Sequence, residues 1–173
     1  MGFKIPSVVS IAGSDSSGGA GIQADMKTIE SLGLFAQTAI TALTAQNTTG
    51  VSGVFDIPAE FVVEQIDAVF GDIRPNAVKI GMVSSASNVV AIAESLRAHA
   101  AENIVVDPVM VSTSGSRLIS EDASEALQGR LFPLASVITP NIPEAEVLWG
   151  CDIASKQDME VAARELSDRF GVA

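Results

Sequence analysis

The sequence predicts an α/β protein built on a doubly wound, mainly parallel sheet with helices on both faces. Three observations lead to this fold class. The chain has 173 residues, which suits one domain rather than two. Hydrophobic residues make up 47% and charged residues 18%, a composition that provides a sizeable core and argues against disorder. Short apolar runs alternate with amphipathic segments along the chain, and this alternation is typical of βαβ units.

The first half of the chain alternates three predicted strands with helices. Residues 8–12 form a short apolar run that predicts a buried strand, and the glycine-rich segment 13–21 breaks it before a first helix. Residues 36–44 are rich in small and β-branched side chains and predict a second strand, and residues 77–80 predict a third. Pro58 suits the first turn of the helix between them. The apolar face of that helix is expected at Phe61, Val62, Ile66, Val69 and Phe70.

The second half continues the same alternation. The spacing predicts helices near residues 87–100, from Ser120 onward, over 143–150 and over 155–171, and strands at 104–106 and 137–138. Ser155 and Asp158 have the spacing of a capping box. The sequence ends on a helix where the alternation predicts another strand, which suggests a fragment. Ligands of such sheets bind at the carboxyl ends of the strands, so the loops after strands are the expected site.

Charge and composition exclude several function classes. Ten Lys and Arg stand against 21 Asp and Glu, and a net charge of −11 argues against binding to nucleic acid or to an anionic membrane surface. One Cys allows no internal disulfide, and one His with one Cys excludes the usual structural zinc sites. No apolar run approaches the roughly 20 residues of a membrane span. A cytoplasmic protein is therefore expected.

The glycine-rich segment 13–21 is the first candidate for chemistry. It has four glycines between a predicted strand and a predicted helix start, where backbone amides can approach a polar or anionic ligand closely. It is not a Walker A motif, because no Lys-Ser/Thr pair follows, and it does not spell Gly-x-Gly-x-x-Gly across the turn. The alternative is a tight, flexible turn.

Polar residues also follow the other predicted strands. Asp107 could hold a metal ion or orient a phosphate, or it could cap a turn. Asn141 and Glu144 could serve the same site; alternatively, Asn141 could cap a helix and Glu144 could favour the dipole of that helix. The amide of Gln46 suits a heterocycle, and its alternative is a surface turn. His99 lies late in a helix away from every strand end, which leaves no Ser-His-Asp triad. These residues favour phosphoryl transfer assisted by Mg²⁺, or a small-molecule binding module.

Five stretches carry a resemblance to a known family. Residues 12–25 (AGSDSSGGAGIQAD) resemble the N-terminal signature of hydroxymethylpyrimidine/phosphomethylpyrimidine kinases, which are thiamine-pathway members of the ribokinase-like superfamily. Four further stretches are similar in order and spacing: 40–48 (ITALTAQNT), 78–82 (VKIGM), 105–110 (VVDPVM) and 138–144 (ITPNIPE). The resemblance covers essentially the whole chain. It implies a single ribokinase-like domain over residues 1–173, incomplete at its C-terminus.

The resemblance implies an activity and a role for ten residues. Family members phosphorylate 4-amino-5-hydroxymethyl-2-methylpyrimidine and then its monophosphate, using ATP and Mg²⁺. By resemblance, Gln46 would bind the aminopyrimidine edge. The hydroxymethyl side would be lined by Gly13, Ala20 and Asp25, and the pocket walls would be Thr44, Met82 and Val109. Thr44 stands where some relatives carry an apolar residue. The Mg²⁺ and phosphate side would be faced by Asp107, Asn141 and Glu144.

The sequence departs from the family pattern in one respect, and this departure affects the expected activity. Family members are longer and carry a Gly-Thr-Gly-Cys-like or Gly-Thr-Gly-Asp-like motif, which supplies the anion-hole amides and the catalytic base. This sequence contains no such motif, so the resemblance assigns it no catalytic residue, and a poor catalyst is expected. Two alternatives stay open: a pyridoxal-type kinase of the same superfamily, and a non-catalytic ligand-binding protein derived from the fold. The resemblance also makes a homodimer an expectation.

Overall fold

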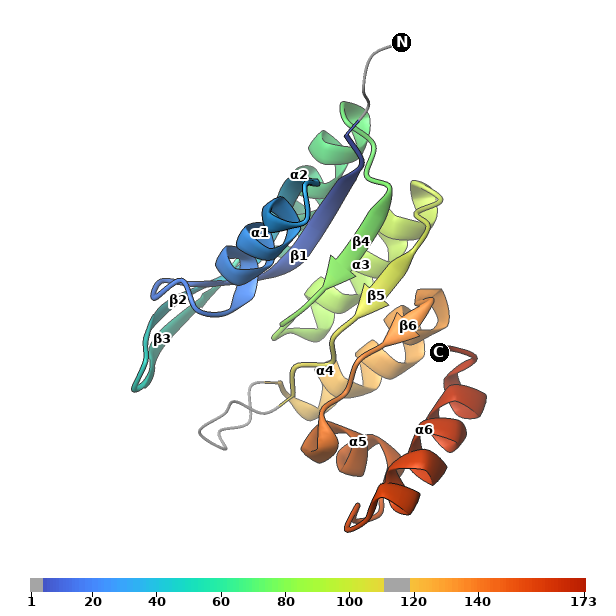
Figure 1. Ribbon diagram of the computed structural model, residues 1–173. Coiled ribbons are helices and arrows are strands. Elements are labelled where there is room, and N and C mark those ends of the chain that lie inside the picture. Colours follow the sequence, from blue (N-terminus) through green and yellow to red (C-terminus); the bar gives the residue numbers. More distant parts are fainter. Residues whose placement is uncertain (1–4, 111–118) are drawn as a thin grey trace.

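The computed structural model describes residues 5–110 and 119–173. Within these residues, a six-stranded sheet has the strand order β3-β2-β1-β4-β5-β6 (Figure 1). The strands are β1 (Ser7–Asp15), β2 (Phe35–Asn47), β3 (Gly50–Asp56), β4 (Ala77–Ile80), β5 (Ile104–Val106) and β6 (Val137–Ile138). Strand β3 pairs antiparallel to β2, and every other neighbouring pair is parallel. The predicted doubly wound, mainly parallel sheet is confirmed.

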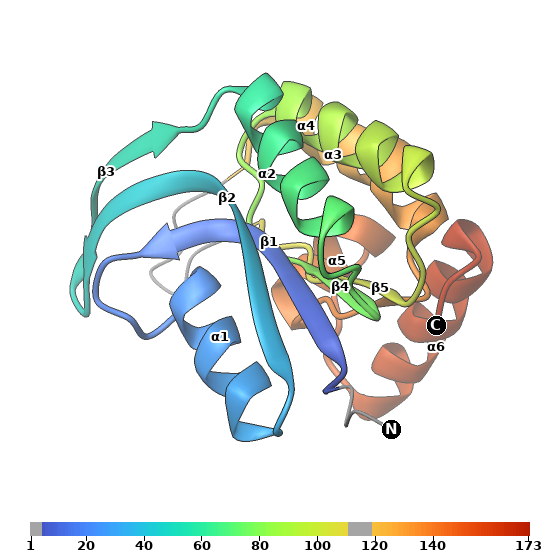
Figure 2. The same cartoon turned by 90° about the horizontal axis from the view of Figure 1, so that it is seen from above.

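Helices cover both faces of the sheet (Figure 2). Helix α1 (Gly21–Ser31) lies on one face, against β1 and β2. Helices α2 (Ala59–Gly71), α3 (Ala86–Ala98) and α4 (Glu121–Ala126) pack side by side on the other face. A π-helical turn at Leu127–Leu131 and a 3₁₀ turn at Phe132–Leu134 continue from α4. Helices α5 (Ile142–Trp149) and α6 (Lys156–Phe170) pack on each other beyond β6.

The main core lies between the central strands and the layer of α2 and α3. Ile11 and Ile80 of the sheet, and Ile66 and Ile92 of these helices, are fully buried. Parallel strands that are covered on both faces read as near-continuous apolar runs, which is why these strands were visible in the sequence. Burying such side chains stabilises the fold by about 1.5–3 kcal/mol each relative to leaving them exposed. None of the helices in the described part of the chain is long and apolar enough to cross a membrane.

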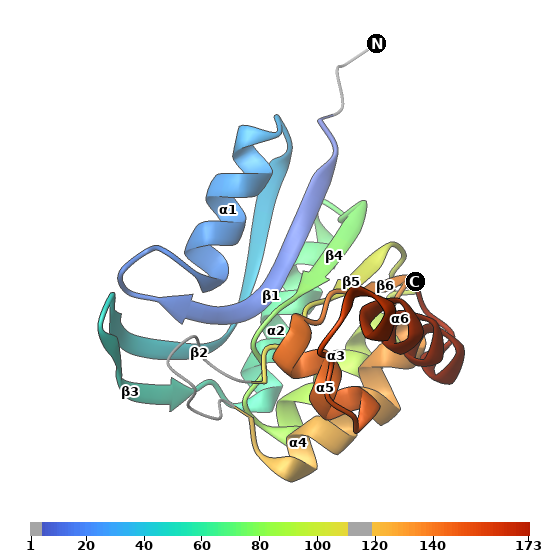
Figure 3. The same cartoon turned by 60° about the horizontal axis from the view of Figure 1, so that its bottom comes forward.

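Two strand predictions need correction. The segment 13–21 was expected to break the first strand at Gly13, but β1 continues to Asp15 because Ser14 and Asp15 pair with Leu43 and Thr44 beyond an irregularity in the register. Strand β3 was not predicted, because its seven residues are all exposed and carry no buried alternation. It forms a hairpin with β2 that extends beyond the rest of the sheet (Figure 3).

The helix predictions hold with three local differences. Pro58 is the N-cap of α2, and Phe61 is 52% exposed rather than part of the buried face. Ser120 stands at the N-cap of α4, but its side chain makes no capping hydrogen bond. His99 is the C-cap of α3, where its Nε2 lies 2.6 Å from Asp67 Oδ1 and its ring stacks on a neighbouring phenylalanine. The capping box at Ser155 is confirmed.

Candidate functional site

The glycine-rich loop between β1 and α1 is shaped by the carboxylate of Asp15. The Asp15 side chain is buried and accepts hydrogen bonds from the backbone amides of Ser17, Gly19 and Ala20 at 2.8–2.9 Å. The Ser17 hydroxyl also donates to it, at 2.7 and 2.9 Å to the two oxygens. An acceptor-only carboxylate can satisfy several donors at once, so one side chain fixes the whole turn.

Those contacts set the charge state of Asp15. Burial acts to raise the pKa of its carboxyl, but hydrogen bonds from Ser17, Ala20 and Gly19 outweigh burial and hold the pKa below its usual range. Asp15 is therefore ionised at neutral pH. Its charge is directed at the loop amides, so it acts as the anchor of the loop.

Close backbone contact explains one glycine of the loop. Gly21 has φ +54°, and a Cβ at this position would collide with the carbonyl oxygen of Gly13. Glycine adopts this conformation without steric cost, which lets the chain turn directly from the loop into α1. A Cβ on Gly13 would lie 2.5 Å from Met82 Cε, so the Met82 thioether packs against bare backbone. The segment from β1 to α1 therefore approaches the end of β4 closely.

The end of β2 is tied to the same loop. The Ser16 hydroxyl donates to the Gln46 carbonyl at 2.7 Å and accepts from the Gln46 amide N–H at 2.8 Å. The Thr44 hydroxyl contacts the Ser14 carbonyl at 2.6 Å and Gln46 Oε1 at 3.3 Å. Gln46 is thus fixed through its backbone, and it is half-buried.

A cluster of charged side chains lies beside these residues. Ser10 of β1 and Lys79 of β4 stand opposite each other in the parallel ladder, and both bond to Asp25 of α1. The Ser10 hydroxyl donates to Asp25 Oδ2 at 2.6 Å, and Lys79 Nζ donates to the same oxygen at 3.0 Å. Asp107, which follows β5, has its Oδ2 3.9 Å from Lys79 Nζ. The cluster joins four segments that are distant in sequence.

Lys79 and Asp25 act in opposite directions on Asp107. Burial raises the pKa of the Asp107 carboxyl above its usual range; the ammonium of Lys79 partly opposes this shift, and the carboxylate of Asp25 adds to it. Protonation of Asp107 therefore needs a less acidic solution than an exposed aspartate would need.

One cavity of about 330 Å³ collects most of the predicted site residues. All seven predicted substrate-binding residues line it, and so does Asp107: Gly13, Ala20, Asp25, Thr44, Gln46, Met82, Val109 and Asp107. They come from the ends of β1, β2, β4 and β5 and from the start of α1. This is the edge of the sheet at which a parallel α/β fold binds its ligands.

Five further lining residues were not singled out as site residues by sequence reasoning: Ser14, Asp15, Gly21, Ala24 and Lys79. Three of them lie within the glycine-rich segment that the sequence marked as a loop. Lys79 had a signal of its own, because it is a charged residue between the buried Val78 and Ile80 of a short strand.

Asn141 and Glu144 are not among the residues that line this cavity. They form a capping box at the start of α5: Asn141 Oδ1 accepts from the Glu144 amide at 3.0 Å, and Glu144 Oε2 accepts from the Asn141 amide at 2.9 Å. Glu144 is buried, and its Oε1 accepts from the Met110 amide at 3.3 Å. Burial raises the pKa of its carboxyl; the backbone hydrogen bonds from Asn141 and Met110 oppose this, and the nearby Asp107 adds to it. Glu144 thus links the loop after β5 to the start of α5.

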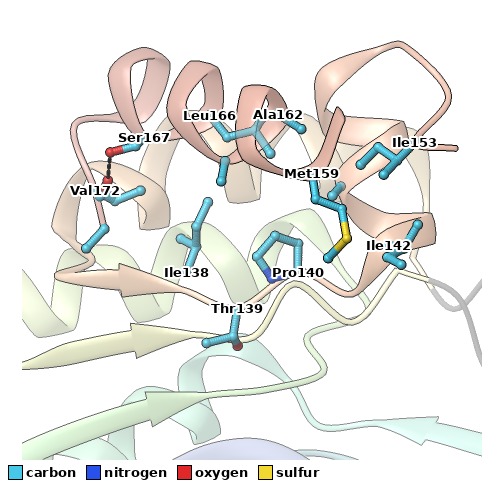
Figure 4. A pocket seen from close by; sticks show the side chains of 13 residues that line it. Ile138, Thr139, Pro140, Ile142, Ile153, Met159, Ala162, Leu166, Ser167 and Val172 are labelled. Atoms are coloured by element: carbon cyan, nitrogen blue, oxygen red, sulfur yellow. Dashed lines mark hydrogen bonds between the residues drawn. The ribbon is translucent and has the colours of Figure 1, made fainter. Parts of the chain in front are cut away.

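A second cavity, of about 250 Å³, lies between β6, α5 and α6 (Figure 4). Its labelled side chains include Ile138, Met159 and Leu166, and the described residues that line it are mainly apolar, with no charged side chain among them. Phosphate or metal chemistry needs charged or strongly polar groups, so this cavity is not the candidate for it. The polar cavity at the strand ends is the candidate functional site.

The donor set at this site can be compared with the needs of metal ions. Within residues 5–110 and 119–173, no group of three or more His, Cys, Asp or Glu side chains is placed to hold a metal. Mg²⁺ does not need such a cage, because it keeps several waters and is bound through one or two carboxylates and the substrate's phosphates. The half-buried carboxylate of Asp107 in the cavity wall fits that mode of binding.

Solved structures with the same architecture define the class of protein. A crystal structure of phosphomethylpyrimidine kinase from Clostridium difficile superposes with a TM-score of 0.89 at 49% identity, over 96% of this chain and 71% of that one. The ADP complex of Bacillus subtilis pyridoxal kinase gives a TM-score of 0.88 at 34% identity, over 98% of this chain and 64% of that one. The fold is that of the ribokinase-like kinases.

Sequence comparison narrows the class to one family. The sequence pattern of the family described as phosphomethylpyrimidine kinase matches residues 15–173, so the chain belongs to this family. The hydroxymethylpyrimidine/phosphomethylpyrimidine kinase of Rhizobium meliloti is 54% identical over 149 residues, which are 86% of this chain and 56% of the relative. The chain spans 30–62% of the length of the curated relatives that it matches here.

Proposed function

We propose that this chain binds 4-amino-5-hydroxymethyl-2-methylpyrimidine as the substrate of an ATP-dependent kinase, and that the kinase also acts on the monophosphate of this compound. The observation that carries the proposal is the convergence of four strand ends and one glycine-rich loop on a single polar cavity. The residues that line the cavity carry both an amide for a heterocycle and a carboxylate for a hydroxyl group. Family membership supports the same activity.

The amide of Gln46 would recognise the aminopyrimidine. A 4-aminopyrimidine edge offers a ring nitrogen that accepts and an amino group that donates, and a side-chain amide offers the complementary pair. Ser16 holds the Gln46 backbone through two hydrogen bonds, so the Gln46 backbone is in place before the ligand arrives. Met82 and Val109 would supply the apolar walls for the ring.

The carboxylate of Asp25 would receive the hydroxymethyl group. Its Oδ2 is already held by Ser10 and Lys79, which fix the orientation of the carboxylate. A fixed acceptor beside the hydroxyl places the oxygen that is to be phosphorylated, and positioning is the main protein contribution to phosphoryl transfer.

Bound MgATP would supply the phosphoryl group and neutralise its charge. We propose that Asp107 would face the metal from the cavity wall, largely through water. Asn141 and Glu144 would serve the same side from the start of α5, although both side chains are engaged in the capping box. Glu144 would then act by holding the Met110 amide next to the Asp107 loop.

Isothermal titration of the chain with the aminopyrimidine alcohol tests the proposal. We expect saturable binding that weakens by about 10-fold or more in Gln46→Ala, because a buried ligand edge loses its hydrogen-bond partners. Gln157→Ala, an exposed glutamine on α6, is the matched control and should bind like the wild type. Absence of binding by the folded wild-type chain would refute the proposed ligand.

Pyridoxal is the second candidate ligand, since a pyridoxal kinase shares this fold at 34% identity. Pyridoxal also carries a hydroxymethyl group on an aromatic heterocycle, but it lacks the amino group that the Gln46 amide would pair with. We therefore expect weaker binding of pyridoxal than of the aminopyrimidine in parallel titrations. Tighter binding of pyridoxal would reverse the assignment.

We also propose that the kinase is a cytoplasmic homodimer. The β2–β3 hairpin carries apolar side chains that face solvent, among them Val54 at 53% exposure and Phe55 at 64%. Exposed apolar surface of this kind favours association of copies. Light scattering after size exclusion should give twice the 17.9 kDa mass of the chain, and a mass of one chain would contradict the dimer.

A further inference from the structure

We propose that Lys79 determines specificity for the phosphorylated substrate: its ammonium binds the phosphate of the monophosphate and contributes little to binding of the alcohol. This inference rests on the proposed function and concerns the same cavity. Among the described residues of this site the other charged side chains are carboxylates, so one lysine would allow the site to accept a second, anionic ligand.

The first argument for this role is the charge balance of the cavity. Among the described residues that line it, the charged ones are Asp15, Asp25, Asp107 and Lys79, three carboxylates against one ammonium. Asp15 directs its charge at the loop amides, but Asp25 and Asp107 lie beside Lys79. A phosphate dianion that entered this cavity would be repelled by both of these carboxylates, so its binding needs a cation nearby.

The second argument is the position of the Lys79 ammonium and the number of hydrogen bonds that it makes. Its Nζ lies between the carboxylate assigned to the hydroxymethyl side, at 3.0 Å, and the one assigned to the phosphate side, at 3.9 Å. An ammonium has three donors, and in the described part of the chain Nζ donates one hydrogen bond, to Asp25. The 3.9 Å separation from Asp107 is longer than a hydrogen bond. Donors therefore remain for a ligand oxygen.

Local packing keeps that ammonium inside the site. A Cβ on Gly81 would lie 2.8 Å from Lys79 Nζ, so the bare backbone of Gly81 leaves the space that the ammonium occupies. The lysine side chain is 27% exposed, which places its charge in a partly desolvated setting where a phosphate contact is stronger than on an open surface. A monophosphate carries its phosphate on the hydroxymethyl oxygen, next to Asp25, and thus within reach of Nζ.

A simple structural role for Lys79 makes a different prediction. If Lys79 only oriented Asp25, its loss would weaken the alcohol and the monophosphate alike. If it binds phosphate, its loss weakens the monophosphate selectively. The ratio of the two dissociation constants therefore separates the two roles, and a general loss of folding does not mimic a selective change.

The test is isothermal titration of both ligands into the wild type, Lys79→Gln and Lys79→Arg. Glutamine keeps a donor for Asp25 and removes the charge. We expect it to weaken the monophosphate by about 10- to 100-fold, the range for loss of a charge-assisted hydrogen bond, and the alcohol by less than about 3-fold. Arginine should keep most of the monophosphate affinity. Lys156→Gln, an exposed lysine at the start of α6, removes the same charge elsewhere and should change neither ligand.

The outcomes distinguish the two proposals. Equal weakening of both ligands in Lys79→Gln, or no weakening, overturns the role of Lys79 and leaves the proposed function standing. A wild type that binds the alcohol but not the monophosphate overturns the role of Lys79 and the proposed action on the monophosphate, and leaves the proposed binding of the alcohol standing. A wild type that binds neither ligand overturns both. A measurement on the wild type alone provides a second test: the ¹⁵N resonance of the Lys79 ammonium should move on titration with the monophosphate and not with the alcohol.

Discussion

Replacing Asp15 with asparagine should loosen the glycine-rich loop, although asparagine has nearly the same size and shape as aspartate. In the wild type, Oδ1 accepts from Ser17 and Oδ2 accepts from the amides of Gly19 and Ala20. In Asp15→Asn, one oxygen becomes an NH₂ group, which is a donor. If the remaining oxygen stays with Ser17, the amides of Gly19 and Ala20 each lose their acceptor.

The expected cost follows from these two bonds. A donor that loses its partner costs about 1–3 kcal/mol, and the low end applies because Gly19 and Ala20 are exposed and water can reach their amides. We therefore expect Asp15→Asn to lower the free energy of unfolding by about 2 kcal/mol at pH 7. Ser17→Ala, which removes only the hydroxyl donor, should cost about 0.5–1 kcal/mol and serves as the control. Urea unfolding measures both values.

The pH dependence gives a sharper check. The pKa of Asp15 is lowered in the folded state, because the loop hydrogen bonds outweigh burial, so its contribution is present above the ordinary aspartate range near pH 4. It is lost as the pH falls through the lower folded value. The difference between wild type and Asp15→Asn should therefore shrink below about pH 4, within the range where both proteins still unfold cooperatively. A difference under about 0.5 kcal/mol at pH 7, or one that does not change with pH, would refute this account of the loop.

Three further substitutions test the packing around the site. Gly21→Ala should destabilise the protein by at least about 1 kcal/mol and weaken ligand binding, because φ is +54° and the new methyl group would meet the Gly13 carbonyl. Unchanged thermal unfolding and unchanged ligand affinity would contradict this prediction. Ile80→Ala should cost about 2–5 kcal/mol in urea unfolding, because the side chain is fully buried in the main core, and a smaller loss would mean that the core relaxes around it. Phe55→Ser should weaken self-association, because the ring is 64% exposed on the hairpin whose apolar surface favours association of copies; a light-scattering mass that stays at twice that of the chain would show that this ring does not join the copies.

The elements that were predicted from the sequence are those whose burial leaves a pattern. Strands β1, β4 and β5 are covered on both faces, so their residues read as apolar runs with few interruptions. Strand β3 leaves no such pattern, since its Val54 and Phe55 face solvent and its pairing depends on the register of β2. Likewise, the extension of β1 to Asp15 is set by a partner strand about 30 residues away, which no local pattern reports.

In the candidate site, too, local contacts could be predicted from the sequence and contacts between distant segments could not. Asn141 could be predicted as a helix cap because its hydrogen bond with the Glu144 amide joins residues three apart, whereas the return bond from the Asn141 amide to Glu144, which completes a capping box, was not predicted. The role of Glu144 in holding Met110 was not visible, because that bond spans 34 residues. A pattern within one helix turn can be read from the sequence, but a bond between two loops depends on how the sheet brings them together.

Lys79 shows how far sequence reasoning can reach at this site. Alternation along a strand places it on the face opposite to the buried Val78 and Ile80, and that face is covered by α1. A cation enclosed there requires an acidic partner, because burying an unpaired charge is costly. The sequence can therefore predict that a partner exists. It offers 21 acidic residues, however, and Asp25 lies 54 residues away, so the partner follows only from the register that sets Lys79 opposite Ser10 beneath α1.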